Sequence, residues 1–368
     1  MALSKQQLTA LQAKGLRWHS AQDSGVSRRG GAGPTDHKAF NFSEQTSMVP
    51  VFNEQVANSP FTAVGSEDDT QILIFEHDKL VDTVTQPQRP KFYDLTTADG
   101  IPYSHIATLH SNDVLATTVL QTCVRYRNRD TSCQFCAIEE SLTHNKTIAH
   151  KTPAQLAEVA RAAVELDGVK QMIMTTGTPK TPDRGAAVLA ESARAVKAVV
   201  DIPIQAQCEP PADDIWFSRL KEAGVDALGM HLEAVSDRVR QAIMPGKASV
   251  PMSRYLSAYK AAARVFGKGN VSTYILAGLG DTEAEILGVS KTLIELGVYP
   301  FVVPFVPVAG TPLANHPMAD SQMLERIFAE LGPLLVEQKM TSETLSAGCA
   351  KCGACSSLKS YEKESACA

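Results

Sequence analysis

Residues 123–136 read CVRYRNRDTSCQFC, and this stretch decides how the rest of the chain is interpreted. Three of the eight cysteines lie in it, with nine residues between Cys123 and Cys133 and two between Cys133 and Cys136. The apolar run from Val114 to Leu120 leads into it, so we expect Cys123 just beyond the end of a buried strand. The carboxyl ends of parallel strands are where ligands bind in α/β proteins. The sequence therefore predicts a ligand site at this loop.

Three cysteines favour a reactive metal centre over a purely structural one. A structural zinc ion and an ordinary iron–sulfur cluster each take four protein ligands. Three thiolates on a [4Fe-4S] cluster leave one iron open for a substrate or cofactor. The alternative is a zinc site with His144 as its fourth ligand. The motif by itself leaves both interpretations open.

The length and composition suit one large domain with appendages, or two domains, with no sign of nucleic-acid binding. The chain has 368 residues, 44% hydrophobic and 20% charged, with a formal net charge of −5 and no basic run. We find no apolar span of membrane-crossing length and no signal peptide, since Met1–Arg17 is polar and helix-like. We therefore expect a cytoplasmic protein. In such a chain, cysteines at close spacing indicate metal ligands and not disulfides.

Residues 1–105 are expected to form an N-terminal α+β region. A capping box at Ser4 predicts a short helix that ends near Gly15. The Gly-rich residues 24–36 predict a loop; a phosphate-binding loop is disfavoured, because no Gly-Lys-Ser/Thr follows and no strand precedes it. Short apolar runs between residues 48 and 94, broken by Asn, Pro, Gly and Asp, predict a small β-rich unit.

Residues 106–338 alternate between short apolar runs and helical periodicity. Six βα units with one hand of crossover predict a parallel sheet curved into a partial, TIM-like (β/α)6 barrel. The six strands are predicted at 114–120, 171–176, 202–207, 227–232, 271–277 and 301–306. The main helices are predicted from Pro153 to Gly168, near 184–200, 213–223 and 252–265, after Thr282, and at 320–337.

Residues 339–368 form a Cys-rich tail, which we expect to fold back over the barrel mouth. The run CAKCGAC at 349–355 matches the first part of the bacterial ferredoxin motif, which needs a fourth cysteine. Zinc usually takes its cysteines as separated pairs, so the spacing favours a second iron–sulfur cluster over zinc or a disordered tail. Cys208 is a distant alternative as fourth ligand. The ligands predicted for this second site are Cys349, Cys352, Cys355 and Cys367.

The close cysteine pair, with Phe135 before Cys136, resembles the cluster motif of the radical S-adenosylmethionine (SAM) enzymes, although their usual first gap is three residues. Further runs in the same order resemble biotin and lipoyl synthases: TTGTP at 175–179, HLE at 231–233, MPGK at 244–247 and GLGDT at 278–282, followed by AGTPL at 309–313. The resemblance implies that Phe135, Thr176, Gly177, His231, Glu233, Lys247 and Gly278 bind the cofactor. The alternatives are a buried core role for His231 and a solvated charge for Lys247.

The resemblance also implies a mechanism. Cys123, Cys133 and Cys136 would hold a [4Fe-4S] cluster whose open iron binds the SAM amine and carboxylate. Reduction by a donor such as flavodoxin or ferredoxin would cleave SAM to a 5′-deoxyadenosyl radical, which abstracts hydrogen from a small-molecule substrate. Neither nucleic acid nor a membrane is expected as a partner. The alternatives are an iron–sulfur electron carrier or sensor without SAM turnover and a zinc-stapled scaffold.

Two further features belong to this interpretation. The run YSHIATLH at 103–110 is similar to the biotin-synthase-related radical SAM subfamily encoded in nitrilase-containing gene clusters. Cys208 follows the third predicted strand, where we interpret it as a buried structural thiol; a hydrogen or sulfur donor in the cavity is the alternative.

Overall fold

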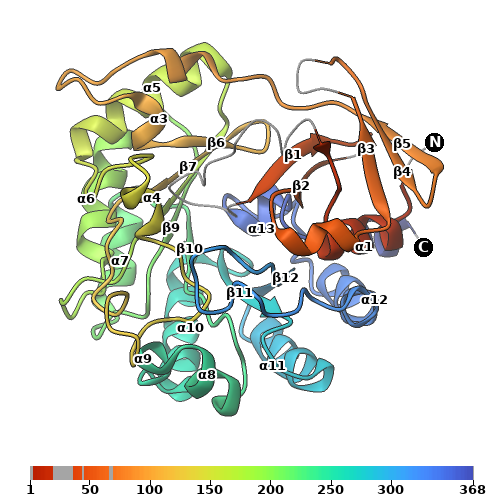
Figure 1. Cartoon of the computed structure of the whole chain (residues 1–368). Helices are drawn as coiled ribbons and strands as arrows, with labels where there is room; N and C mark the ends of the chain where they lie inside the picture. The colour runs from red at the N-terminus through yellow and green to blue at the C-terminus, as the bar shows by residue number, and fades with distance from the viewer. Residues whose placement is uncertain (1–2, 20–35, 44, 66–68, 368) are drawn as a thin grey trace.

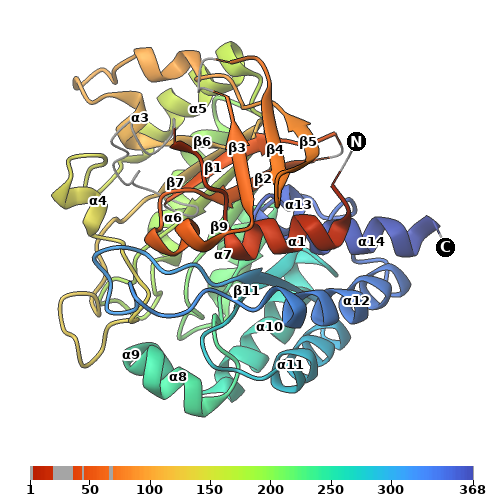
Figure 2. The same cartoon turned by 45° about the vertical axis from the view of Figure 1, so that its right-hand side comes forward.

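The computed structural model describes residues 3–19, 36–43, 45–65 and 69–367, so the loop predicted at 24–36 falls outside it except for Asp36. The N-terminal region combines one helix with a two-stranded and a three-stranded antiparallel sheet (Figure 2). The capping box at Ser4 and the helix end at Gly15 are confirmed. The elements are α1 (Lys5–Lys14), β1 (His37–Asn41), β2 (Thr46–Pro50), η1 (Glu54–Asn58), β3 (Phe61–Val64), β4 (Ile72–Glu76), β5 (Lys79–Val84) and η2 (Lys91–Asp94).

The central sheet has seven strands in the order β12-β11-β10-β9-β8-β7-β6 and curls into a half-barrel (Figure 1). Strands β7 to β12 run parallel, which confirms the six predicted strands. Strand β6 pairs antiparallel with β7 and was not predicted, because three residues are too few for a periodic pattern. The strands are β6 (Thr108–His110), β7 (Val114–Thr118), β8 (Gln171–Thr175), β9 (Ile204–Gln207), β10 (Ala227–Gly229), β11 (Val271–Ala277) and β12 (Val298–Pro304).

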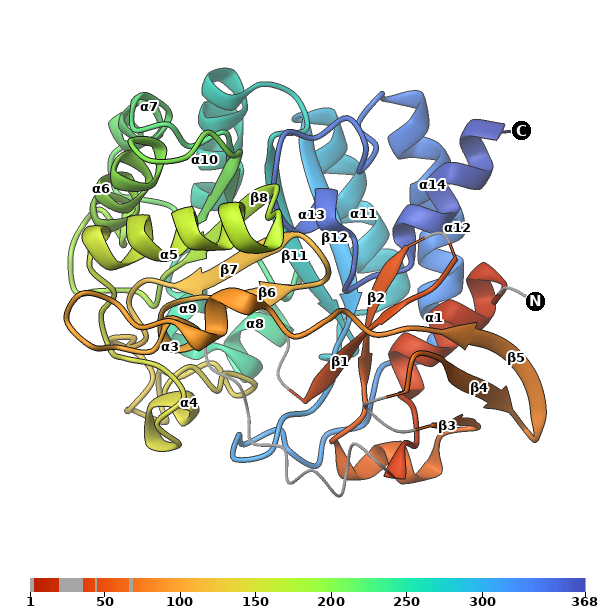
Figure 3. The same cartoon turned by 90° about the horizontal axis from the view of Figure 1, so that it is seen from above.

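Long helices form an arc around the outer face of this sheet, as Figure 3 shows from above. Two begin with the capping boxes that the sequence predicts, at Thr152 and Thr282, and Gly168 ends the first of them in a left-handed conformation. The helices are α3 (Tyr103–Ile106), α4 (Glu140–Thr143), α5 (Pro153–Asp167), α6 (Ala186–Lys197), α7 (Ile215–Glu222), α8 (Asp237–Ile243), α9 (Pro245–Ala248), α10 (Met252–Phe266), α11 (Glu283–Glu295) and α12 (Ser321–Glu337).

One apolar core joins the sheet to these helices and extends into the tail. All residues of β7 and β9 are buried, as expected for strands covered on both faces. Leu345, Ala350, Leu358 and Tyr361 of the tail lie in the same core. Within the described residues, no helix combines the length and the apolar character that crossing a membrane requires.

The tail lies at the amino-terminal ends of the barrel strands, and the prediction that it covers the barrel mouth is wrong. The backbone N–H of Gly348 donates to the side chain of Gln171, the first residue of β8, over 2.7 Å. The N–H of Cys349 donates to Gln205 of β9 over 3.1 Å. A Cβ on Gly348 would lie 2.2 Å from the Gln205 side chain, so only glycine permits this approach. Helices α13 (Cys349–Cys352) and α14 (Leu358–Cys367) follow, and α14 packs on α12.

Candidate functional site

The cysteine loop leaves the carboxyl end of β7 beside the segment that follows β8. The N–H of Gly177 donates to the carbonyl of Leu120 over 2.8 Å. The N–H of Val124 donates to the carbonyl of Thr178 over 2.9 Å. A Cβ on Gly177 would lie 2.2 Å from the carbonyl oxygen of Thr122. Glycine is therefore required here so that the cysteine loop can lie directly against the turn after β8.

Two contacts anchor the long first gap of the motif to the barrel. Arg125 and Glu209 form a buried ion pair, and Thr178 donates to the same carboxylate over 2.8 Å. Burial lowers the pKa of Arg125, but Glu209 outweighs this effect, so the pKa is raised overall. The N–H of Gly246 donates to the carbonyl of Thr131 over 3.1 Å. The nine residues between Cys123 and Cys133 thus follow a path fixed by contacts with Glu209 and Gly246.

The three cysteines of the motif lie near enough to one another, at one end of the barrel, for their charges to interact. A turn closed by the N–H of Cys136 and the carbonyl of Cys133, 3.0 Å apart, holds the close pair. Burial raises the pKa of Cys133 well above its usual range, and the charges of Glu233, Cys136 and Cys123 also act on it. Burial raises the pKa of Cys136 to about 12. The seven cysteines whose side chains are described form no disulfide.

An apolar wall supports the close pair from behind. Cys133 and Phe135 pack against a small cluster of buried side chains at this end of the barrel. This cluster explains physically why an aromatic residue precedes the last cysteine, since its ring fills the space between the loop and the strand ends. The buried members of the cluster are Ala234, Val239, Met244, Leu279 and Phe305.

Charged and polar groups from β10 and its continuation face the cysteines. Lys247 donates to Glu233 over 2.6 Å, and both side chains are largely buried. Burial lowers the pKa of Lys247, but the Glu233 carboxylate raises it overall. Glu233 has a φ of +65°, a left-handed conformation that is uncommon for a residue other than glycine. His231 accepts from the N–H of Tyr274 at Nδ1 over 3.1 Å, and burial lowers its pKa to about 3.

A cavity of about 390 Å³ runs through the barrel and connects the two cysteine-rich segments. Phe135 and Cys136 line it at one end, and Cys349 and Cys355 of the tail line it at the other. His231 and Glu233 lie between them. Apart from Cys367, the other predicted site residues are not among those that line it; they are Cys123, Cys133, Thr176, Gly177, Lys247, Gly278 and Cys352.

The N-terminal region contributes to the same cavity, which the sequence did not predict. Gln12 of α1, His37 of β1 and Met48 of β2 are among its lining residues. The N–H of Met48 donates to the carbonyl of Ala354 in the tail over 2.7 Å. This contact places the N-terminal sheet against the cysteines of the tail.

The tail thiols sit among polar partners from three strands, and the neighbouring Ser356 contacts a fourth. Gln207 of β9 donates to Cys349 Sγ over 3.1 Å, and Tyr274 of β11 hydrogen-bonds to Cys349 and Cys355. The Sγ of Cys355 lies 3.7 Å from Nε2 of His110 on β6, and Ser356 donates to the carbonyl of Val302 on β12 over 2.7 Å. The fourth predicted ligand, Cys367, ends α14, and its side chain lies outside the described part of the structure.

The zinc alternatives find little support in the geometry. In the described part of the chain, no three His, Cys, Asp or Glu side chains converge closely enough to hold a single metal ion. A cluster spreads its ligands over several irons, so it needs no such convergence. His144 is exposed, and its Nδ1 is 2.8 Å from the carbonyl of Glu140. Cys208 packs in the barrel core and does not line the cavity, as expected for a structural thiol.

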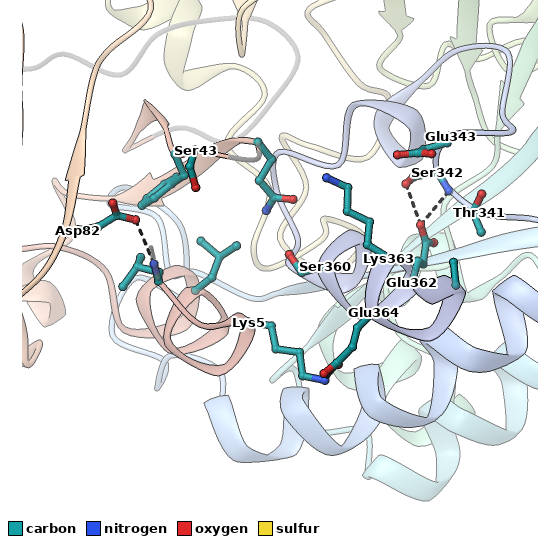
Figure 4. A pocket seen from close by; sticks show the side chains of 15 residues that line it. Lys5, Ser43, Asp82, Thr341, Ser342, Glu343, Ser360, Glu362, Lys363 and Glu364 are labelled. Atoms are coloured by element: carbon teal, nitrogen blue, oxygen red, sulfur yellow. Dashed lines mark hydrogen bonds and ion pairs between the residues drawn. The ribbon is translucent and has the colours of Figure 1, made fainter. Parts of the chain in front are cut away.

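A second cavity, of about 670 Å³, lies between α1, β5 and α14 (Figure 4). Its walls carry charges of both signs, including Lys5, Asp82, Glu343 and Lys363. Glu362 is buried there and accepts from the N–H and hydroxyl of Ser342 over 2.9 and 2.7 Å. None of the lining residues is a cysteine, histidine or tyrosine, so this cavity lacks the donors of the barrel site.

Sequence reasoning missed the polar groups that line the cavity between the cysteines. His110, Gln207 and Tyr274 lie on strands and look like ordinary sheet residues in the sequence. The one available signal was Gln207 as a polar residue inside a run predicted to be buried on both faces. A buried glutamine needs partners, and here the tail provides them.

Comparison with known proteins finds similarity to one superfamily over part of the chain. Residues 126–293 match the model of the radical SAM superfamily. The chain is 25% identical over 230 residues to the bacteriochlorophyllide c C-7(1)-hydroxylase of Chlorobaculum limnaeum, covering 57% of each protein. It is 26% identical over 168 residues to the lipoyl synthase of Citrifermentans bemidjiense, covering 45% of this chain and 54% of that protein. The chain thus spans little more than half the length of these curated relatives.

Solved structures that are similar to part of the chain are less identical to it. Methylornithine synthase is 17% identical with a TM-score of 0.45, over 60% of this chain and 61% of that one. The FeFe-hydrogenase maturase HydG from Carboxydothermus hydrogenoformans is 18% identical with a TM-score of 0.47, over 60% and 51%. The match to the family model begins inside the cysteine loop, three residues after Cys123, and ends within α11. It shows a radical SAM domain over residues 126–293 of the chain.

Proposed function

We propose that this protein is a radical SAM enzyme that acts on a small molecule held in the barrel cavity of about 390 Å³. The radical SAM domain matched over residues 126–293 supports a [4Fe-4S] cluster and SAM as its cofactors. When bound, these two groups supply reductive cleavage of SAM and a radical that abstracts hydrogen. The protein's own part is to hold them, to orient the substrate and to exclude water.

Cys123, Cys133 and Cys136 are the proposed ligands of this cluster. The mutual electrostatic effect of the three thiols supports the proposal, as does their position at the carboxyl ends of the strands. Three thiolates leave one iron position open, which suits the amine and carboxylate of SAM. Arg125 lies close enough to raise the local positive charge, and its pair with Glu209 fixes it there.

Glu233 and Lys247 are the proposed partners of the SAM ribose and carboxylate. Their ion pair supports a shared role, because SAM would bring both a pair of hydroxyls and an anion to it. His231 lines the cavity beside them, and its low pKa keeps the imidazole neutral at ordinary pH. Thr176, Gly177 and Gly278 are proposed to contribute backbone at the rim of the site, where a side chain on Gly177 would collide with the cysteine loop.

The tail is proposed to hold a second iron–sulfur cluster through Cys349, Cys352 and Cys355. The spacing of these cysteines and the cavity that Cys349 and Cys355 share with Cys136 support this proposal. A substrate in the cavity would then lie between SAM and the second cluster. Such a placement suits chemistry like that of biotin and lipoyl synthases, with an electron donor such as flavodoxin or ferredoxin as the external partner.

The observation that carries the proposal is that Cys136 and Glu233 line one cavity together with Cys349 and Cys355 of the tail. The test is anaerobic incubation of the reconstituted protein with SAM and dithionite. Cys133→Ala should abolish 5′-deoxyadenosine formation while retaining the tail's iron, about four atoms per chain. Cys208→Ala is the matched control, since this thiol is buried away from the cavity, and it should cleave SAM like the wild type. Undiminished SAM cleavage by Cys133→Ala would refute the assignment of Cys133 as a ligand of the SAM-cleaving cluster. An iron–sulfur carrier without SAM turnover would form no 5′-deoxyadenosine, whether as wild type or as Cys208→Ala.

A further inference from the structure

From the surroundings of the tail cysteines we infer that His110 is the fourth protein ligand of the tail cluster, through Nε2. The inference rests on the proposed second cluster and replaces Cys367 in it. It adds a residue from the barrel to a site otherwise built from the tail, and so it makes the cluster a link between the two.

The contacts at the tail single out this histidine. Nε2 of His110 lies 3.7 Å from Sγ of Cys355, and Oγ of the next residue, Ser111, lies 3.7 Å from Sγ of Cys352. His110 is 9% exposed and lines the cavity together with Cys355. Adjacent residues at the end of β6 thus contact two of the three thiols. The cavity beside them gives the room in which a cluster can separate the thiol and the imidazole.

The fold holds His110 in this position. Its backbone pairs with Val114 of β7, and Ser111 begins the reversal between the two strands with a φ of +57°. The tail is fixed from the other side, because Gln12 and Met48 both donate to the carbonyl of Ala354, over 2.9 and 2.7 Å. Both partners are therefore placed by backbone contacts that do not depend on the cluster.

Chemistry favours His110 over the other groups nearby. Three thiolates each bind one iron of a four-iron cluster, so the fourth iron needs another ligand. Imidazole nitrogen is an accepted ligand of cluster iron, as the two-iron Rieske centres show. Gln207 and Tyr274 instead contact the Cys349 thiol as hydrogen-bond partners. Such bonds to cluster sulfur tune a cluster without binding iron.

Cys367 is poorly placed for the same role. It ends the ten-residue helix α14, and a rise of 1.5 Å per residue puts its backbone about 14 Å from Leu358. Figures 2 and 3 both show the C-terminus at the end of α14 that points away from α13. Moving Cys367 to the other cysteines would require α14 to leave its packing on α12.

The test isolates the tail cluster in the full-length chain. Cys123, Cys133 and Cys136 are changed to Ala together, so that the tail provides the remaining site. The protein is reconstituted anaerobically, reduced with dithionite or europium(II), and studied by pulsed EPR with and without heavy-nitrogen-labelled histidine. We expect about four irons per chain and a directly bound histidine nitrogen in the spectrum. His110→Cys should keep the iron and lose this nitrogen coupling, and the exposed control His144→Ala should keep both.

Each outcome decides a different point. A spectrum without a directly bound histidine nitrogen, or one unchanged in His110→Cys, would overturn the ligand assignment and leave the cluster standing. Absence of iron from the triple variant would overturn both the tail cluster and the role of His110. Neither result would affect SAM cleavage at the first site, which Cys133→Ala tests separately. Iron retention by His110→Cys guards against misfolding, because this variant offers a fourth thiolate at the same position.

Discussion

The pair formed by Glu233 and Lys247 allows stability and SAM binding to be separated. The two groups are 2.6 Å apart, with 9% of the Lys247 side chain and 19% of the Glu233 side chain exposed. Glu233→Gln keeps the shape of the side chain and removes its charge, which leaves the Lys247 ammonium buried without its counter-ion. Lys247→Met removes the cation in a side chain of similar length, and the double variant removes both charges.

The expected loss of stability follows from burial. Breaking a buried ion pair costs about 3–5 kcal/mol, and we expect about 2–3 kcal/mol for Glu233→Gln because the carboxylate is partly solvated. The double variant should recover most of this loss, since it leaves no uncompensated charge. Anaerobic urea unfolding of the apo protein, monitored by circular dichroism, measures both values. A single variant as stable as the wild type would show that the ion pair is absent in solution.

SAM affinity then distinguishes a ligand from a scaffold residue. If Glu233 binds the ribose, Glu233→Gln should weaken SAM binding by about 1–3 kcal/mol, the range for lost charged hydrogen bonds. Isothermal titration of the cluster-loaded protein with SAM measures this difference. The double variant should remain weak although its stability has returned. Recovery of both properties in the double variant would refute the ribose role and leave Glu233 as the counter-ion of Lys247.

Two further predictions concern the cysteine loop and its surroundings. Gly177→Ala should destabilise the protein by about 1–3 kcal/mol and weaken cluster assembly, because its Cβ would meet the Thr122 carbonyl at 2.2 Å. The control Gly288→Ala has open space around it in α11 and should instead stabilise the protein by about 0.5–1 kcal/mol. Equal effects of the two substitutions on urea unfolding would contradict the close approach at Gly177. Lys151 is fully buried beside Gln121, and burial lowers its pKa to about 7. Between about pH 7 and pH 10 the Lys151 amine is therefore protonated in the unfolded chain and neutral in the folded chain. The free energy of unfolding of the wild type should rise with pH in this range relative to that of Lys151→Met. Parallel dependence of the two unfolding free energies on pH would refute the burial of this amine.

The sequence predicted the barrel well because its strands are continuous apolar runs and its helices carry explicit start signals. Strand β11 spans Val271–Ala277 as predicted, and the helix after Thr152 begins at Pro153. Strand β10 was predicted to reach Leu232 and ends at Gly229. The apolar pattern continues there, but the chain then turns at Glu233, whose left-handed conformation brings its carboxylate to Lys247. A pattern of burial cannot distinguish a strand from a buried segment that approaches a site.

The sequence predicted the position of the cysteine loop at 123–136 and did not predict the position of the tail cysteines. Cys123 and its neighbours follow a strand in the sequence, so their place at the carboxyl end of the barrel followed from topology. The position of the tail inside the barrel depends on Gln171 and Gln205, whose side-chain oxygens accept hydrogen bonds from the backbone N–H groups of Gly348 and Cys349. These contacts join residues more than a hundred positions apart, and glutamine carries no pattern that indicates such a partner.

The tail is both a wall of the cavity and a part of the core, and this dual role constrains its function. Leu345, Leu358 and Tyr361 are almost fully buried in the barrel core, and each large apolar side chain contributes about 1.5–3 kcal/mol on burial. Together these three approach the entire stability of a typical domain, about 5–15 kcal/mol. Deleting the tail would therefore unfold the barrel as well as remove its cysteines. Substituting the cysteines alone leaves this packing in place, so a loss of iron or activity in such variants can be assigned to the thiols.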